Sequence, residues 1–251
     1  MSLKGKHAVI TGGGSGVGAA MAAAFAAQGA KVTVLGRRLE PLQEVAAPLG
    51  GFAASSDVTN RASVEAALDA ARDVNGPVQV AVANAGAAPS KPFAKMSSAD
   101  FSAALGVNLE GVFNLWQSAL ADMQGQGWGR MIAVASTAGL KGYPYVAGYC
   151  AAKHGVVGLT RALAQELAKS GITVNAICPG FIETPLLEAS VRTITAKTGM
   201  SREDAVKRLS AGNPQGRLIQ PQEVADTALW LASDAAGSVN GSALPLSGGE
   251  I

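Results

Sequence analysis

Short runs of apolar residues recur along the chain, and most end at a glycine, an asparagine or another small polar residue. They lie at residues 6–10, 31–35, 52–54, 78–82, 131–135, 172–177 and 242–246. Such runs are short for helices, and most are too uniformly apolar for half-exposed strands, which is typical of strands buried on both faces. Segments with helical spacing separate them, among them residues 19–28, 98–124, 149–169 and 221–232. We therefore expect parallel strands that alternate with helices.

This alternation predicts an α/β fold with a doubly wound parallel sheet of the Rossmann type and about seven strands. No Pro/Ser-rich linker or shift of composition divides the 251 residues. We therefore expect residues 1–251 to form a single domain that binds a dinucleotide and carries the catalytic residues. Residues 186–213 carry scattered apolar and basic side chains, and we expect them to form a lid or a wall of the substrate site.

Composition excludes several classes of function. The net charge is only +2, without the basic runs that follow a phosphate backbone, so no nucleic acid partner is expected. No apolar run reaches about 18 residues and no signal peptide is recognisable, so we expect no membrane attachment. The two cysteines, Cys150 and Cys178, form no metal motif or disulfide framework and favour a cytoplasmic location. With only His7 and His154 as histidines, a hydrolase triad or a metal cluster is not expected.

A glycine-rich loop joins the first strand to the first helix. Residues 12–18 contain five glycines, and Gly12, Ser15, Gly16, Val17 and Gly18 are the candidate cofactor contacts. Glycines let the backbone approach a pyrophosphate, and a helix N-terminus offers free N–H groups and a positive dipole end. A plain flexible turn is the alternative, but the placement between strand and helix favours a nucleotide site.

The end of the second strand indicates which dinucleotide is bound. Sites that prefer NAD usually carry an acidic residue there, which accepts hydrogen bonds from the adenine ribose. This chain has Gly36 followed by Arg37 and Arg38, whose guanidinium groups suit a phosphate. We therefore expect NADP, with Arg37 as the principal contact to the 2′-phosphate; NAD is the alternative.

Polar residues follow other strands and interrupt one helix. Asp57 could contact the adenine amine or simply cap the next helix, for which Thr59 and Asn60 are also candidate caps. The side chain of Asn84, at the end of the fourth strand, can tie down neighbouring backbone. Asn108 lies within the helix expected at 98–124, where asparagine is disfavoured, so it indicates either a local distortion or a tolerated polar residue.

The candidate catalytic groups follow the fifth strand. Ser136 lies at the end of that strand, and Tyr149 and Lys153 are four residues apart near the start of a helix, on one face. A phenol is a poor base at neutral pH, and a nearby cation favours its phenolate form, so we expect Lys153 to lower the pKa of Tyr149. An ordinary surface tyrosine and lysine would be the alternative for the pair taken alone.

Taken together, these motifs resemble the classical short-chain dehydrogenase/reductase family, and its 3-oxoacyl reductases in particular, over essentially the whole chain. The resemblance implies hydride transfer between nicotinamide and a carbonyl or secondary alcohol, with no metal. It implies that Ser136, Tyr149, Lys153 and Asn108 are catalytic, with Asn108 in a water relay, and that Tyr149 and Lys153 also contact the cofactor. Further cofactor contacts implied by the resemblance are Val58, Asn84, Ala85, Gly86, Pro179, Gly180, Ile182 and Thr184. Family members commonly form homotetramers through their two long helices, here 98–124 and 149–169.

The substrate is left open by these motifs. A 3-oxoacyl or 3-hydroxyacyl thioester is the favoured small-molecule substrate, because residues 175–184 resemble those of 3-oxoacyl thioester reductases. A small alcohol, a sugar or a cyclic ketone is the alternative among enzymes. A nucleotide-binding sensor without catalysis is a second class of function, and the complete set of Ser136, Tyr149 and Lys153 argues against it.

Overall fold

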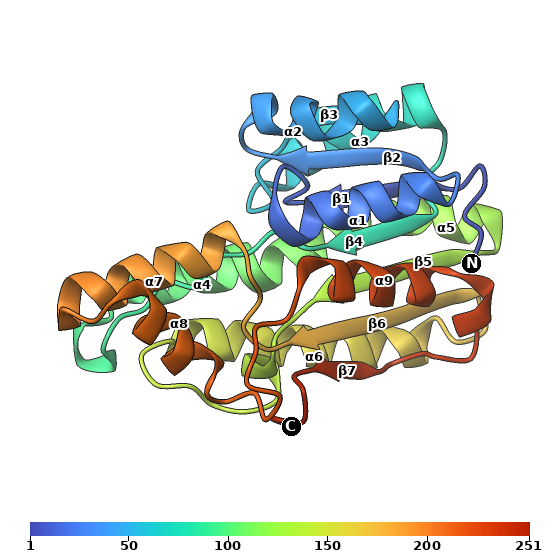
Figure 1. The fold of residues 1–251 in the computed structure, drawn as a ribbon. Helices are drawn as coiled ribbons and strands as arrows, with labels where there is room; N and C mark the ends of the chain where they lie inside the picture. Colours follow the sequence, from blue (N-terminus) through green and yellow to red (C-terminus); the bar gives the residue numbers. More distant parts are fainter.

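The computed structural model describes residues 1–251, and its centre is a seven-stranded parallel sheet (Figure 1). The strand order is β3-β2-β1-β4-β5-β6-β7. The strands are β1 (His7–Thr11), β2 (Lys31–Gly36), β3 (Phe52–Ser55), β4 (Val80–Ala83), β5 (Gly129–Val134), β6 (Ile172–Pro179) and β7 (Ala243–Leu246). The doubly wound sheet is confirmed, with strand ends within three residues of the predicted ones.

Helices cover both faces of this sheet (Figure 1). One face carries α1 (Gly16–Ala27), α2 (Leu39–Ala46) and α9 (Pro221–Ala232), and the other carries α3 (Arg61–Asn75), α5 (Gly111–Gln126) and α6 (Ala147–Glu166). The remaining helices, α4 (Ser98–Leu105), α7 (Pro185–Thr198) and α8 (Arg202–Ser210), project beyond the carboxyl ends of the strands, toward the left of Figure 1. Short 3-10 turns lie at Ala47–Leu49, Phe93–Lys95, Thr137–Gly139 and Asp234–Ala236.

The strands are mostly apolar because successive side chains enter two different cores. In β1, Ala8 and Ile10 pack with α1 and α9, whereas Val9 packs with α3 and α5. Buried parallel strands have this pattern because each face of the sheet is covered by helices. The packing leaves only the ends of the sheet open, so polar residues at the carboxyl ends of the strands can meet a ligand.

The predicted helix at 98–124 is divided by a π-helical segment, Gly106–Glu110, between α4 and α5. Asn108 lies at its centre and is fully buried. Its Nδ2 donates to the carbonyls of Ala104 and Ala87, at 2.9 Å each, and its Oδ1 accepts from the Ala87 N–H at 3.1 Å. Of the two alternatives for Asn108, the local distortion is therefore present, and the side chain joins the helix to the loop after β4.

The segment expected to form a lid or wall is mostly helical. It contains α7 and α8, which share a small core of Leu187, Val191 and Ala205, separate from the two cores of the sheet. The Thr184 hydroxyl caps α7 by accepting from the Leu187 N–H at 3.4 Å. None of the helices has the length and apolar character that crossing a bilayer requires.

Candidate active site

The glycine loop between β1 and α1 is closely packed beneath the start of the helix. A Cβ atom at Gly18 would lie 2.7 Å from Asn84 Nδ2 and 2.9 Å from the carbonyl carbon of Gly12, and one at Gly13 would lie 2.6 Å from Val34 Cβ. Gly12 and Gly16 have φ values of +66° and +53°, which glycine adopts freely. Ser15 is exposed at the N-cap and makes no side-chain cap, so its backbone geometry, rather than its hydroxyl, starts the helix.

Asn84 and Thr11 join this loop to the end of β4. Asn84 Nδ2 donates to the carbonyls of Thr11 and Gly12, at 2.9 and 3.2 Å. In return, Thr11 Oγ1 accepts from the backbone N–H groups of Asn84 and Ala85, at 3.1 Å each. The asparagine ties down neighbouring backbone, as expected. Sequence reasoning did not identify Thr11 as a bracing residue, although a threonine at the last position of a strand was a visible signal.

Both arginines after β2 line the same cleft as the glycine loop. The cleft holds about 400 Å³ and is lined by Gly12, Gly14, Ser15, Gly36, Arg37, Arg38, Pro41 and Leu42. Neither arginine makes an ion pair in this chain. The two guanidinium groups lie beside a glycine loop whose backbone a pyrophosphate can approach closely. This arrangement suits a dinucleotide that carries an additional phosphate. The residues present therefore fit NADP.

The residues after β3 form hydrogen bonds mainly with other residues of the protein. Asp57 Oδ1 accepts from the backbone N–H and the hydroxyl of Thr59, at 3.0 and 2.8 Å, and these bonds lower the pKa of Asp57. Asn60, rather than Asp57, caps α3 by accepting from the Ser63 N–H at 3.1 Å. Val58 is buried, and its carbonyl accepts from Asn114 Nδ2 at 2.8 Å. Contacts of Asp57 with the adenine and of Val58 with the cofactor stay predictions.

The structure brings Ser136, Tyr149 and Lys153 together. Ser136 follows β5, and its Oγ accepts from the Ala138 N–H at 3.1 Å, which starts a short turn. Tyr149 and Lys153 project from the beginning of α6, with Lys153 Nζ 5.6 Å from the centre of the Tyr149 ring. Lys153 is 3% exposed, and its Nζ donates to the Val134 carbonyl at 2.8 Å, so the ammonium is fixed against the end of β5.

The expected lowering of the Tyr149 pKa is wrong for this structure. Burial raises the pKa of Tyr149, and the strongest opposing effect is a hydrogen bond with Ser136, not the charge of Lys153. Burial also lowers the pKa of Lys153 from 10.5 to about 8. Desolvation disfavours the charged form of each residue and is the largest cause of both shifts. The packing of the site therefore favours the neutral form of Tyr149.

Gly86 lies between Asn108 and Lys153. A Cβ atom at Gly86 would lie 3.0 Å from Asn108 Oδ1 and 3.9 Å from Lys153 Nζ. The glycine therefore lets the loop after β4 pass between the π segment and the lysine. The Asn108 amide is occupied by Ala104 and Ala87, so any part in a proton relay has to come from its backbone or from its effect on neighbouring groups.

The loop after β6 lies beside the glycine loop. Pro179 is the last residue of β6, and the Gly180 N–H donates to the Leu246 carbonyl at 2.9 Å. Ile182 forms an isolated parallel bridge with Ile219. A Cβ atom at Gly16 would lie 3.3 Å from Thr184 Cγ2. The structure thus places this predicted cofactor segment against the glycine loop.

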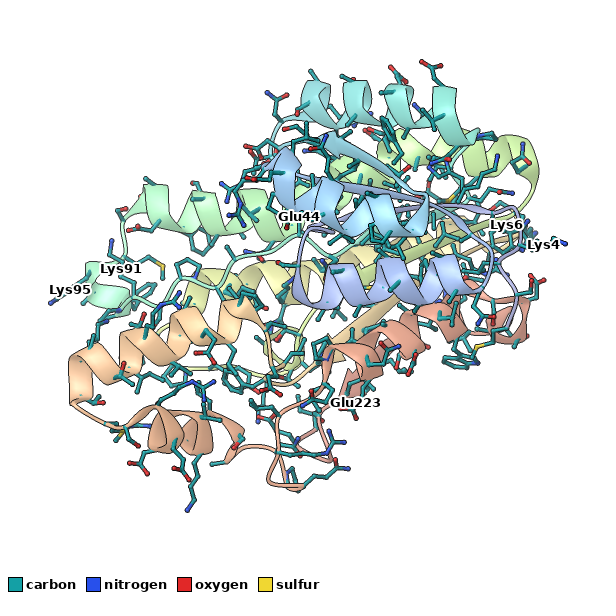
Figure 2. All side chains as sticks on the ribbon, turned by 45° about the horizontal axis from the view of Figure 1, so that its top comes forward. Lys4, Lys6, Glu44, Lys91, Lys95 and Glu223 are labelled. Carbon is teal, nitrogen blue, oxygen red and sulfur yellow. The ribbon has the colours of Figure 1, made fainter.

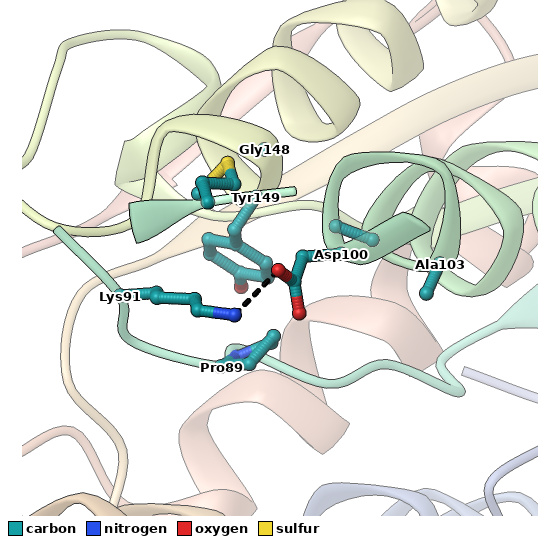
Figure 3. Close-up of a pocket in the computed structure, with 8 residues that line it drawn as sticks. Pro89, Lys91, Asp100, Ala103, Gly148 and Tyr149 are labelled. Carbon is teal, nitrogen blue, oxygen red and sulfur yellow. Dashed lines mark hydrogen bonds and ion pairs between the residues drawn. The ribbon is translucent and has the colours of Figure 1, made fainter. Parts of the chain in front are cut away.

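A smaller cavity of about 110 Å³ opens beside Tyr149 (Figure 3). Pro89, Met96, Ala103 and Ala104 give it apolar walls, and Lys91 and Asp100 form an ion pair of 2.5 Å across it. In Figure 2, Lys91 and Lys95 lie at the end where α4 and α7 project, far from Lys4 and Lys6. Sequence reasoning missed Lys91 and Asp100, although the Ser97–Asp100 capping box was a readable signal.

Comparison with known proteins gives concordant matches. The family model described as short chain dehydrogenase matches residues 6–195. A putative ketoacyl reductase of Streptomyces coelicolor is 39% identical over 250 residues, which cover 96% of this chain and 95% of the relative. D-threitol dehydrogenase of Mycolicibacterium smegmatis is 37% identical over 252 residues, which cover 98% of this chain and 93% of the relative. A crystal structure of a variant actinorhodin polyketide ketoreductase with NADPH superposes with a TM-score of 0.94 at 35% identity, and the match covers 100% of this chain and 99% of that one.

Proposed function

Because this chain belongs to the short-chain dehydrogenase family, we propose that it is an NADP(H)-dependent oxidoreductase that interconverts a carbonyl and a secondary alcohol. The observation that carries this proposal is the placement of Ser136, Tyr149 and Lys153 beside a cavity, on the same edge of the sheet as the arginine-lined cleft. The NADPH of the superposed ketoreductase supports the choice of cofactor. NAD stays the alternative.

The bound nicotinamide would supply the hydride. In the reductive direction, Tyr149 donates its proton to the carbonyl oxygen. The Ser136 hydroxyl donates a hydrogen bond to the same oxygen and stabilises its developing charge. Lys153 holds positive charge close to the tyrosine and would contact the ribose of a bound cofactor. The π segment at Asn108 displaces backbone carbonyls from regular helical pairing and supports a water relay there.

The substrate class that we propose is a 3-oxoacyl thioester. The names of the ketoacyl reductase relatives support it, and so do the apolar walls of the cavity beside Tyr149. A sugar alcohol is the second candidate, because the D-threitol dehydrogenase is nearly as similar.

Turnover of the cofactor tests the function. Wild-type protein is assayed by cofactor absorbance, with NADPH for acetoacetyl coenzyme A and cyclohexanone and with NADP⁺ for D-threitol, and Tyr149→Phe serves as the matched variant. We expect NADPH-dependent reduction of the thioester and a loss of about 10²- to 10⁴-fold in Tyr149→Phe, with NADPH binding kept. Cofactor binding without any turnover would favour the sensor function. Turnover of Tyr149→Phe within a few-fold of wild type would show that Tyr149 is not the proton donor.

Assembly and location belong to the same proposal. We propose a homotetramer, supported by the family resemblance and by Phe101 and Phe113, which lie on α4 and α5 and are 38% and 43% exposed. Analytical ultracentrifugation at several protein concentrations tests it. A cytoplasmic location is supported by two free cysteines, Cys150 and Cys178.

A further inference from the structure

The carboxylate of Glu250 joins the end of the chain to the loop between Ser136 and Tyr149. Its Oε1 accepts from Lys141 Nζ and from the Tyr143 hydroxyl, at 2.7 Å each. The Tyr143 oxygen also lies 2.7 Å from Thr137 Oγ1, next to Ser136. The Glu250 side chain is only 6% exposed, whereas that of Lys141 is 40% exposed. A buried carboxylate with so few partners depends on each of them.

Two other segments meet at the same carboxylate. A Cβ atom at Gly212, after α8, would lie 2.8 Å from Glu250 Oε1, and one at Gly180, after β6, would lie 3.5 Å from Oε2. The Tyr143 ring meets the Phe181 ring edge to face, with 6.3 Å between their centres. Glu250 therefore lies where the loop after Ser136, the loop after β6 and the end of the α7–α8 pair converge.

We propose that Glu250 is a positioning residue for the carbonyl substrate. Its carboxylate holds residues 137–143 against the loop after β6, and this fixes the space that a substrate enters beside Ser136 and Tyr149. None of these contacts involves the glycine loop or the two arginines, and Gly180 is the one predicted cofactor residue that the carboxylate approaches. The inference rests on the proposed function, because it assigns a role within that same site.

Kinetics and cofactor binding separate this role from a general structural one. The variants are Glu250→Ala, which removes both interactions, Glu250→Gln, which keeps an acceptor for Tyr143, and Tyr143→Phe. With acetoacetyl coenzyme A, we expect Glu250→Ala to raise KM by about ten-fold or more while kcat changes little. The KM of Glu250→Gln should lie between those of Glu250→Ala and the wild type. The Kd of NADPH, measured by its fluorescence, should stay within about two-fold of wild type. The control is Glu203→Gln, which replaces an exposed glutamate on α8. Its KM, its kcat and its Kd for NADPH should all match those of the wild type.

Hydrogen exchange gives a readout that does not depend on turnover. The N–H groups of Leu140 and Lys141 both donate to the Thr137 carbonyl, at 2.9 Å each. In Glu250→Ala these amides should exchange faster, while those of α1 do not change. Unchanged exchange would overturn the proposal, as would faster exchange with an unchanged KM or a parallel loss of NADPH affinity. If the wild type reduces none of the carbonyl compounds, the proposed function fails, and the exchange result alone decides whether Glu250 holds the loop.

Discussion

Replacing Lys153 by methionine is expected to stabilise the protein while it removes activity. Lys153 is 3% exposed, and burial lowers its pKa from 10.5 to about 8. At about 1.4 kcal/mol for each pKa unit, burying the ammonium costs about 3 kcal/mol at neutral pH. Methionine has a similar length without the charge, but it leaves the Val134 carbonyl unpaired, at a cost of about 1–3 kcal/mol. We expect a net gain in the free energy of unfolding of about 1 kcal/mol.

The pH dependence of this difference identifies its cause. Because the folded pKa lies below the unfolded one, the unfolded chain binds more protons between about pH 8 and 10.5, so the lysine's contribution to stability rises with pH in that window. Below about pH 8 both states are protonated and the full cost is present. Between pH 7 and about pH 9.5 the wild type should therefore gain about 2 kcal/mol relative to Lys153→Met.

Urea unfolding of the cofactor-free protein at the two pH values measures both effects. The exposed Lys169→Met is the control and should behave like wild type at each pH. If the difference between wild type and Lys153→Met does not change with pH, the buried-charge explanation is refuted. If Lys153→Met is less stable than wild type at both pH values, the bond to Val134 outweighs the desolvation of the ammonium.

Three further predictions test the loops around the site. Gly18→Ala places a Cβ 2.7 Å from Asn84 Nδ2, so it should lower Tm and weaken NADPH binding about ten-fold, whereas Gly125→Ala, with open space around it, should do neither. Tyr145 has a φ of +68°, so Tyr145→Gly should raise the free energy of unfolding by up to about 1 kcal/mol in urea titrations, and an equal gain in Tyr145→Ala would contradict relief of strain. Arg37→Asp should reduce kcat/KM with NADPH by about 10- to 100-fold and raise the relative efficiency with NADH; unchanged preference would overturn the assignment of Arg37.

Features of the fold and of the site that depend on neighbouring residues or on the ends of strands could be predicted from the sequence. The glycines of residues 12–18 and the four-residue spacing of Tyr149 and Lys153 could be placed in the fold from the alternation of strands and helices. Asn108 signalled a distortion because asparagine is disfavoured within helices, although the pattern could not show that the distortion is a π segment.

What the sequence could not show depends on contacts between distant segments or on burial. The direction of the Tyr149 pKa shift follows from desolvation, which is a property of the packed site and not of the spacing to Lys153. Glu250 and Tyr143 are 107 positions apart, and nothing near either residue indicates the other. The helices α7 and α8 were missed because their apolar residues form a small separate core, which leaves a weak helical pattern.

The π segment at Gly106–Glu110 also changes the direction in which the side chains of α5 point relative to those of α4. One additional residue in a helical turn rotates all later side chains by about 100° around the axis. This rotation allows Asn108 to face the loop after β4 while Trp116, two turns later, faces the core with 1% exposure. Deleting one residue here would restore a regular helix but would turn either the asparagine or the tryptophan away from its partners. The register of this helix therefore links the polar chemistry at one end to the packing at the other.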